Sequence, residues 1–171
     1  MATVVVFTGL PGSGKSTLAE RVARTFGAPA FSGDWLMGAL KPFGVLDHLD
    51  RPAYLDMYYG LLQTLIVHQL MLNQSAIVDC LVDGDHVAAW REIAVRHGAN
   101  LVIVECACGD VALHRSRIEG RMRGIPDWHE VDWAHVERMR SEFPPLATAD
   151  IVVDAVNSVE TNSSIVLSLL Q

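Results

Sequence analysis

Four runs of apolar residues along the chain lack the polar alternation that marks a half-exposed strand. They lie at positions 4–8, 76–79, 101–106 and 151–154. A fifth, short strand is expected within the stretch that begins near Gly27 and ends at Asp34. Strands that are apolar on both faces occur in sheets whose two faces are both covered, which is typical of parallel sheets. The pattern therefore predicts five buried parallel strands.

The segments between these strands carry apolar residues at helical spacing. In the first segment, 15–26, the side chains of Leu18, Val22 and Phe26 share one face. Further helices are expected at 53–72, 86–97, 131–143 and 159–170, and one more begins after Gly109-Asp110. Five successive strand-then-helix units predict a single domain over residues 1–171, built as a three-layer α/β/α sandwich.

Composition narrows the set of partners. The formal net charge of −7 argues against a broad basic face for nucleic acid. The longest apolar stretch, 61–72, is interrupted by polar residues, so it predicts a buried helix and no membrane span. Met1 leads directly into the first strand without a leader, and Cys80, Cys106 and Cys108 lack the spacing of a zinc or redox pair. We therefore expect a cytoplasmic protein with reduced cysteines.

The turn between the first strand and the first helix carries the candidate chemistry. Its sequence, Gly9-Leu10-Pro11-Gly12-Ser13-Gly14-Lys15-Ser16-Thr17, satisfies the pattern G-x-x-x-x-G-K-[ST] in full. A strand that ends in such a turn and reopens as a helix aims several backbone N–H groups and the positive end of the helix dipole at one point. The turn is therefore predicted to bind phosphate.

Eight residues of this turn are predicted to bind the nucleotide: Gly9, Pro11, Gly12, Ser13, Gly14, Lys15, Ser16 and Thr17. Arg117 and Arg121, discussed below, complete the predicted nucleotide-binding set. The glycines permit dihedral angles and a close approach that a side chain would block, and the proline stiffens the turn. Lys15 should reach the β and γ phosphates, the Ser16 hydroxyl should ligate Mg²⁺, and Thr17 should donate to the α phosphate.

Two aspartates are expected near the same turn. Asp34 ends the second predicted strand, and ligands of open α/β sheets bind outside the carboxyl ends of the strands. Capping of the following helix is the alternative role for Asp34. Asp79 closes the apolar strand 76–79, which is the pattern of a Walker B carboxylate. Ser16 and Asp79 are therefore the predicted ligands of Mg²⁺.

Positive charge is concentrated after the fourth predicted strand, in a chain whose only lysines are Lys15 and Lys41. The cluster consists of Arg115, Arg117, Arg121 and Arg123. Arg117 and Arg121 are four residues apart, so on one helix their guanidinium groups would share a face and clamp a polyphosphate. Glycine and proline at 124–128 break that helix before it resumes at 131, which predicts a hinged helical lid at about 115–130. The alternative is a solvated basic face paired with Glu119 and Glu130.

With these motifs the sequence resembles the small P-loop kinases grouped with chloramphenicol phosphotransferase, the kinase half of polynucleotide kinase, and gluconate kinase. The resemblance covers nearly the whole chain and rests on 9–17, on Phe-Ser-Gly-Asp-Trp at 31–35, and on 117–121. It implies a P-loop NTPase fold with strand order 2-3-1-4-5 and transfer of the γ-phosphoryl group of ATP to a hydroxyl.

The resemblance also implies roles for individual residues. Asp34 looks like the carboxylate that accepts the proton of the acceptor hydroxyl, and Arg91 lies where relatives often place an arginine near the acceptor. Arg117 and Arg121 look like the lid arginines. The predicted catalytic set consists of Lys15, Asp34, Arg117 and Arg121. The phosphoryl transfer that they serve depends on neutralised charge and an aligned acceptor.

The acceptor itself is expected to be a small molecule with an apolar part, because the residues after Asp79 are apolar where a polynucleotide kinase would carry a polar signature. The predicted walls of its pocket are Trp35, Met37, Leu40, Phe43, Leu81 and Val82. A nucleoside, nucleotide or polynucleotide 5′-hydroxyl kinase is the alternative within the same class. A nucleotide-gated binding protein with slow hydrolysis is the alternative from another class. The oligomeric state, the preference for ATP over GTP, and contacts of Arg91, Arg115 and Arg123 with substrate stay open at this stage.

Overall fold

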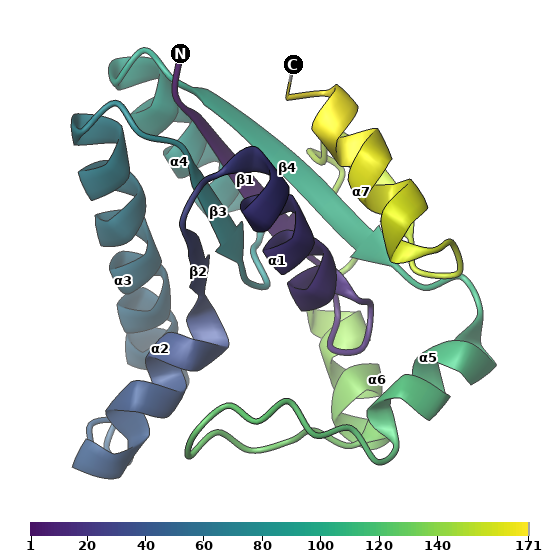
Figure 1. The fold of residues 1–171 in the computed structure, drawn as a ribbon. Coiled ribbons are helices and arrows are strands. Elements are labelled where there is room, and N and C mark those ends of the chain that lie inside the picture. The colour runs from purple at the N-terminus through teal and green to yellow at the C-terminus, as the bar shows by residue number, and fades with distance from the viewer. Residues whose placement is uncertain (171) are drawn as a thin grey trace.

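The computed structural model describes residues 1–170. Its five-stranded sheet has the order β2-β3-β1-β4-β5 (Figure 1). The strands are β1 (Thr3–Thr8), β2 (Ala30–Ser32), β3 (Ala76–Asp79), β4 (Asn100–Ala107) and β5 (Ile151–Asp154). Every neighbouring pair is parallel. The predicted parallel sheet and its strand order are therefore confirmed.

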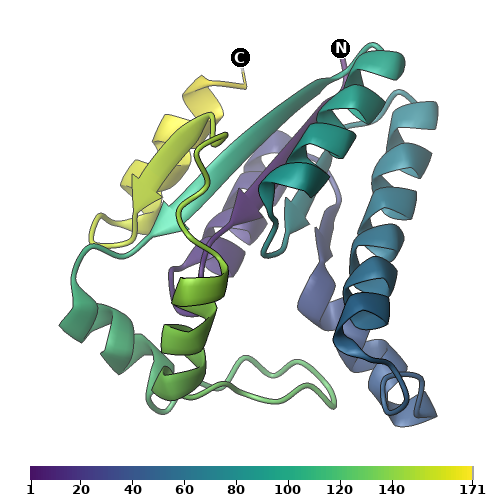
Figure 2. The same cartoon turned by 180° about the vertical axis from the view of Figure 1, so that it is seen from behind.

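Helices cover both faces of this sheet. They are α1 (Lys15–Phe26), α2 (Gly33–Leu40), the short 3-10 helix η1 (Lys41–Phe43), α3 (Arg51–Met71), α4 (Gly84–Arg96), α5 (Val111–Ile118), α6 (Trp133–Glu142) and α7 (Val159–Ser168). Helices α1 and α7 lie on the face toward the viewer in Figure 1, and α3 and α4 lie on the opposite face, seen in Figure 2. The three-layer architecture follows from this arrangement.

The core is divided by the sheet into two apolar clusters. Val4 and Val6 of β1 belong to the cluster under α3 and α4. Val5 and Phe7 belong to the cluster under α1 and α7. Because successive side chains of a strand point to opposite faces, a strand with apolar neighbours on both sides must be apolar at every position. This explains the unbroken apolar runs in the sequence.

The second strand is shorter than predicted. β2 ends at Ser32, and Asp34 lies in the first turn of α2 rather than at the end of the strand. The helix begins early because of packing: Gly33 is buried, and a Cβ at this position would lie 2.1 Å from the hydroxyl of Tyr58 on α3. Ser32 has extended dihedral angles and occupies the N-cap position. Asp34 is therefore neither a strand residue nor the capping residue.

The arginine-bearing helix is also shorter than predicted. α5 ends at Ile118, and Gly120 follows in the left-handed region with φ of +76°. A glycine in this conformation just past the last turn is a common way for a helix to end. Arg121 therefore lies outside the helix, and the expectation that it shares a helix face with Arg117 is wrong. Residues 119–132, which connect α5 to α6, form an irregular segment that we call the arginine loop.

Among residues 1–170, none of the helices combines the length and the apolar character that a membrane crossing requires.

Candidate functional site

Helix α1 differs from most helices of this chain in how it begins. Five other helices start with a side-chain cap, from Asp50, Asp83, Asp110, Asp132 and Ser158. The cap position of α1 is Gly14, with φ of +80° and no side chain to offer. The first helical bond runs from the amide of Leu18 to the carbonyl of Gly14. The amide of Ser13 already donates to the carbonyl of Leu10, so the first-turn amides of Lys15, Ser16 and Thr17 are the ones available to an anion.

Two glycines of the turn are required by its surroundings. Gly9 has φ of +138°, and a Cβ there would lie 2.2 Å from the carbonyl oxygen of Cys106 on β4. Gly12 has φ of +83°, and a Cβ there would lie 2.8 Å from Ile118 Cδ1 and 3.0 Å from His114 Cδ2. The turn is thus pressed between the end of β4 and helix α5, which fixes its shape before any ligand binds.

His114 joins helix α5 to this turn. Its Nε2 lies 2.7 Å from the carbonyl oxygen of Pro11, so Nε2 carries the hydrogen and donates. The ring also packs edge-on against Trp133 of α6, with centroids 5.2 Å apart. Burial lowers the pKa of His114, and the nearby cations Arg140, Arg117 and Lys15 lower it further, while the bond to Pro11 acts in the opposite direction. The ring is therefore neutral in the folded protein near pH 7.

This lowered pKa predicts a loss of stability in mild acid. Below about pH 6.5 the unfolded chain protonates His114 while the folded protein does not, so the unfolded state binds more protons and gains population. We expect the free energy of unfolding to fall as the pH is lowered from 7.5 to 5.5, by at most about 1.4 kcal/mol per pH unit for this group. Urea unfolding at several pH values measures the slope. The variant His114→Gln, which keeps a donor, should have a smaller slope, and equal slopes would contradict the assignment.

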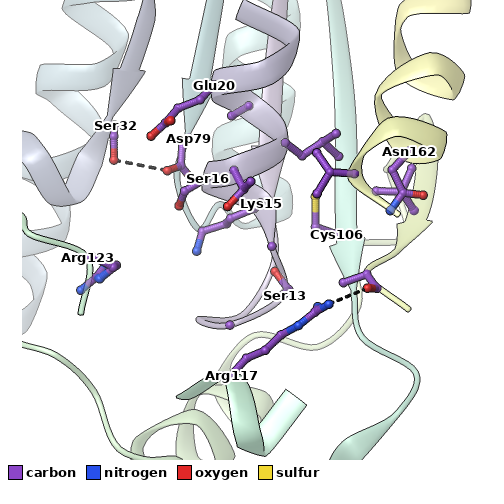
Figure 3. Close-up of a pocket in the computed structure, with 18 of the residues that line it drawn as sticks. Ser13, Lys15, Ser16, Glu20, Ser32, Asp79, Cys106, Arg117, Arg123 and Asn162 are labelled. Carbon is purple, nitrogen blue, oxygen red and sulfur yellow. Dashed lines mark hydrogen bonds between the residues drawn. The ribbon is translucent and has the colours of Figure 1, made fainter. Parts of the chain in front are cut away.

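Asp79 lies in the centre of the sheet's carboxyl edge. It pairs in register with Phe7 on β1 and with Ser32 on β2. The side chain is 9% exposed. Its Oδ2 accepts a hydrogen bond from the Ser32 hydroxyl at 3.4 Å, while Oδ1 has no partner among the described residues (Figure 3). A buried carboxylate oxygen without a donor is well suited to a cation or to a water held by one.

A cavity of about 1140 Å³ opens over the start of α1. Its lining runs from residues 12–20 across the sheet edge to the turn between β5 and α7, at Ala155–Val159. Arg117, Arg121 and Arg123 also line this cavity. The Nη2 of Arg117 donates to the carbonyl oxygen of Ala155 at 2.9 Å, and in Figure 3 this side chain extends across the cavity below the P-loop. The size and the cationic wall fit a nucleotide with its phosphates.

A second cavity, of about 430 Å³, lies on the other side of Lys15. Asp34 lines it, and so do aromatic residues of three segments: Tyr54, Tyr58 and Tyr59 of α3, Trp128 of the arginine loop, and Phe143 after α6. Burial raises the pKa of Tyr54 to about 12, and the nearby Asp34 adds to this effect. The Tyr54 phenol therefore stays protonated and can donate a hydrogen bond.

Most of the residues predicted to line the pocket of an acceptor do not line this second cavity. Of the six residues only Leu81 lines it. Met37 and Val82 are buried in the core, and Leu40 packs against the same cluster. Trp35 lines the first cavity, and Phe43 is 79% exposed. The apolar wall comes instead from α3, because this long helix lies along the edge of the crevice and turns its tyrosines toward it.

Four residues line both cavities: Lys15, Ser32, Asp79 and Arg123. They mark the place where the two spaces meet. Lys15 comes from the P-loop, Ser32 and Asp79 from the carboxyl ends of β2 and β3, and Arg123 from the arginine loop. A group transferred from a molecule in one cavity to a molecule in the other would pass between these side chains.

The arginine loop meets the junction through a group of four charges. Glu130 Oε2 lies 3.5 Å from Arg121 Nε and 3.1 Å from Arg123 Nε. Arg123 Nη1 in turn donates to Asp34 Oδ2. The side chains of Arg121 and Arg123 are only 16% and 15% exposed. Burial lowers the pKa of Arg121, and the neighbouring Arg123 lowers it further.

Two other arginines of the sequence analysis lie outside both cavities. Arg91 donates to both carboxylate oxygens of Asp150, at 2.9 and 2.8 Å, and thereby anchors the segment that leads into β5. Arg115 pairs with Glu119 at 2.8 Å on the surface of α5. The expectation that Arg91 lies near an acceptor is wrong, whereas the alternative of a solvated ion pair holds for Arg115.

Sequence reasoning missed several residues of the site. Ser32 belongs to a stretch that was recognised, but its contact with Asp79 arises from strand pairing. The sequence predicts for Glu130 only the role of a solvated partner, and no sequence motif singles out Tyr54. The one usable signal was the tight clustering of arginines around Arg123, which indicated an anion site without showing which arginine faces which group.

A sequence model described as an AAA domain matches residues 4–146 of the chain. A cytidylate kinase from Pyrobaculum islandicum is 24% identical over 173 residues, covering 97% of this chain and 90% of that protein.

Solved structures with the same fold include two kinases. The gluconokinase of Sinorhizobium meliloti superposes with a TM-score of 0.67 and 19% identity, covering 98% of this chain and 90% of its own. The APS kinase of Mycobacterium tuberculosis, in complex with AMPPNP and APS, superposes with a TM-score of 0.63 and 20% identity, covering 99% of this chain and 97% of its own. At these identities the likeness establishes the fold.

Proposed function

The chain belongs to the AAA domain family and has the fold of the small P-loop kinases, and from this premise we propose that it is a phosphotransferase that moves the γ-phosphoryl group of ATP to a hydroxyl of a small molecule. The observation that carries this proposal is the junction between the two cavities. A large cavity over an uncapped helix start suits the nucleotide, and a smaller one suits an acceptor. Lys15 lines both.

The donor nucleotide would lie in the larger cavity. Its phosphates would meet the amides of the P-loop, the Lys15 ammonium, and the hydroxyls of Ser16 and Thr17. Its base would lie toward the turn at Ala155–Val159, where apolar side chains suit the faces of a purine. Arg117 and Arg121 also line this cavity, so the arginine loop and the end of α5 would act together as a lid over the phosphates.

Two side chains that line the larger cavity, Ser16 and Asp79, fit a magnesium ion bound mainly through phosphate oxygens and water. The unpartnered Oδ1 of Asp79 and the Ser16 hydroxyl would hold it. In the part of the chain that the structure describes, no three acidic, histidine or cysteine side chains come together, as a metal site built by protein alone would require. When bound, the ion would neutralise charge on the β and γ phosphates.

Asp34 lies in the smaller cavity in the first turn of α2. In this position its carboxylate would orient the acceptor hydroxyl and take its proton as the new bond to phosphorus forms. The Tyr54 phenol would donate a hydrogen bond to another polar group of the acceptor. The aromatic wall would pack against its carbon skeleton, which supports a small organic acceptor over a polynucleotide.

A nucleoside or nucleotide is the second candidate acceptor. The same aromatic side chains that would pack against a carbon skeleton can also stack on a base. The relative from Pyrobaculum islandicum carries the name cytidylate kinase, which supports this candidate. A nucleotide would accept the phosphoryl group on a phosphate oxygen and would need no base, so the importance of Asp34 separates a nucleotide from a hydroxyl acceptor. A nucleoside would accept on a hydroxyl and would need Asp34 as well, so only the identity of the labelled product distinguishes it from another small molecule.

The proposal is tested by following labelled γ-phosphate from ATP with Mg²⁺. The protein is incubated with a panel of nucleosides, nucleotides, sugars, aminoglycosides, phenicols and a 5′-hydroxyl oligonucleotide, beside the variant Asp34→Asn. We expect a labelled small-molecule product with the wild type and little or none with the variant. Labelled free phosphate alone, formed equally by both proteins, would contradict transfer and favour a nucleotide-gated binding protein.

A further inference from the structure

Arg123 holds one orientation at the junction of the two cavities. Its Nη1 donates to Asp34 Oδ2, a contact between residues 89 positions apart in the sequence. Its Nε donates to Glu130 Oε2 at 3.1 Å, and its Nη2 donates to the carbonyl oxygen of His129 at 3.0 Å. All three guanidinium nitrogens are therefore engaged, and the side chain is 15% exposed.

Glu130 fixes this orientation from within the loop. Its Oε1 accepts the backbone N–H of Arg123 at 2.7 Å, and its Oε2 accepts from the guanidinium of the same residue. Burial disfavours the charged form of Glu130, but the backbone N–H and the guanidinium of Arg123 outweigh it and hold the pKa of the carboxyl below its usual value. A carboxylate that binds both the backbone and the side chain of one residue leaves that residue little freedom.

The tip of the arginine loop rests on the helix that carries Asp34. A Cβ at Gly38 of α2 would lie 2.6 Å from the carbonyl oxygen of Pro126. Gly120 and Gly124, with φ of +76° and +66°, lie on either side of the segment that bears Arg121 and Arg123. The loop therefore spans from α5 to α2, and its arginine reaches Asp34 only while the tip lies on this helix.

Arg121 and Arg123 differ in what they bind. The ion pair of Arg121 with Glu130 uses only Nε, at 3.5 Å, and the Arg121 side chain lines the nucleotide cavity alone. Arg123 lines both cavities and is paired with the proposed base. Arg121 is thus placed for phosphate, whereas Arg123 occupies the face of Asp34 that an acceptor hydroxyl would need.

We propose that Arg123, positioned by Glu130, caps Asp34 while the acceptor cavity is empty and so suppresses hydrolysis of ATP. This inference rests on the function proposed above. In hydrolysis a water oxygen would bond to the γ-phosphorus, the bond from that phosphorus to the bridging oxygen of ADP would break, and the water proton would pass to Asp34. The guanidinium occupies Oδ2 and neutralises the carboxylate, so water is neither oriented nor deprotonated there. An acceptor hydroxyl displaces Arg123, which then turns toward the transferring phosphoryl group.

The test measures hydrolysis of ATP with Mg²⁺ in the absence of any acceptor. Arg123→Gln should hydrolyse ATP about tenfold faster than the wild type, which is a small part of the roughly 10² to 10⁴ that a positioned base supplies. Glu130→Gln should show a smaller increase, because Arg123 is present but less well held. Arg123→Lys keeps a cation and should stay nearer the wild-type rate. Arg115→Gln is the matched control, since Arg115 pairs only with Glu119 outside both cavities, and should leave the rate unchanged.

The double variant Arg123→Gln/Asp34→Asn assigns the increase to the base. Its hydrolysis should return to the wild-type rate, because the uncapped carboxylate is gone. Fast hydrolysis in the double variant would overturn the proposal, and so would an unchanged or lower rate in Arg123→Gln. A merely structural role of Arg123 would loosen residues 119–132 in hydrogen exchange without raising hydrolysis.

Binding of AMPPNP by the wild type separates this inference from the function on which it rests. Absence of AMPPNP binding would overturn the proposed function and this inference together. Tight AMPPNP binding combined with unchanged hydrolysis in Arg123→Gln would overturn the capping role alone. Tight binding with the expected increase in Arg123→Gln, lost in the double variant, supports both.

Discussion

Replacement of Lys15 by alanine is expected to abolish phosphoryl transfer, with a fall in kcat/KM of about 10³ to 10⁵, as for other single cations that act on the transferring group. Lys15 follows Gly14 directly and lines both cavities. Its ammonium is therefore placed to stabilise the negative charge on the β,γ-bridging oxygen and on the transferred group. No other lysine of the chain lies in the nucleotide cavity. The measurement is the rate of label transfer from γ-labelled ATP to the acceptor found by the panel.

A matched control for this variant is available on the same helix. Arg24→Ala removes an exposed cation that pairs with Glu20 at 3.6 Å and lines neither cavity. Its transfer rate should stay within about twofold of the wild type, because the variant stays folded: an exposed ion pair contributes at most about 1 kcal/mol to stability. Substantial transfer by Lys15→Ala, with kcat within tenfold of the wild type, would contradict the proposal that phosphoryl transfer takes place at the junction of the two cavities.

The variant Asp34→Asn should separate binding from chemistry. We expect the affinity for ATP to change by less than about threefold and kcat to fall by about 10² to 10⁴, the range that a positioned general base contributes. The amide is nearly the same size, so the first turn of α2 stays intact, and the loss of an acidic group there costs only about 0.3 to 1 kcal/mol. Steady-state kinetics with the identified acceptor and direct AMPPNP binding give the two quantities.

Two further measurements make this result decisive. Asp56→Asn, an exposed acid of α3 that lines neither cavity, should leave kcat unchanged. Urea unfolding should show Asp34→Asn to be folded, because its contacts lie at the surface of the crevice. Wild-type kcat in Asp34→Asn would remove Asp34 as the base and favour a phosphate-accepting nucleotide kinase.

The part of the site built by contiguous residues could be predicted in detail. The P-loop, its preceding strand and α1 depend on local rules: glycines permit positive φ, an apolar strand feeds the turn, and a helix begins at Lys15 as expected. The bounds of β3 and β5 also agreed with the apolar runs. β3 is buried at all four positions and ends at Asp79, whereas the edge strand β5 is only partly buried, with Val152 61% exposed, and ends at Asp154.

Errors arose where a residue distant in sequence decides the local structure. Tyr58 of α3 packs against Gly33, so α2 begins two residues earlier than the sequence indicated and carries Asp34 with it. Gly120 ends α5, although Gly124 with Pro126 was the stronger apparent helix breaker. The smaller cavity is lined by tyrosines of α3, a helix whose sequence pattern shows only a wide apolar face.

The sequence by itself therefore determined the glycine-rich turn that leads into α1 and the layering of the sheet, because apolar runs, glycine dihedrals and helix starts are properties of short segments. Only the tertiary structure decided what each of three arginines contacts. Arg117, Arg121 and Arg123 are chemically equivalent, yet one bonds to the carbonyl of Ala155, one faces the nucleotide cavity, and one pairs with Asp34. Their separation depends on the path of the arginine loop from α5 to α2, and that path is set by packing between segments about 90 residues apart in the chain.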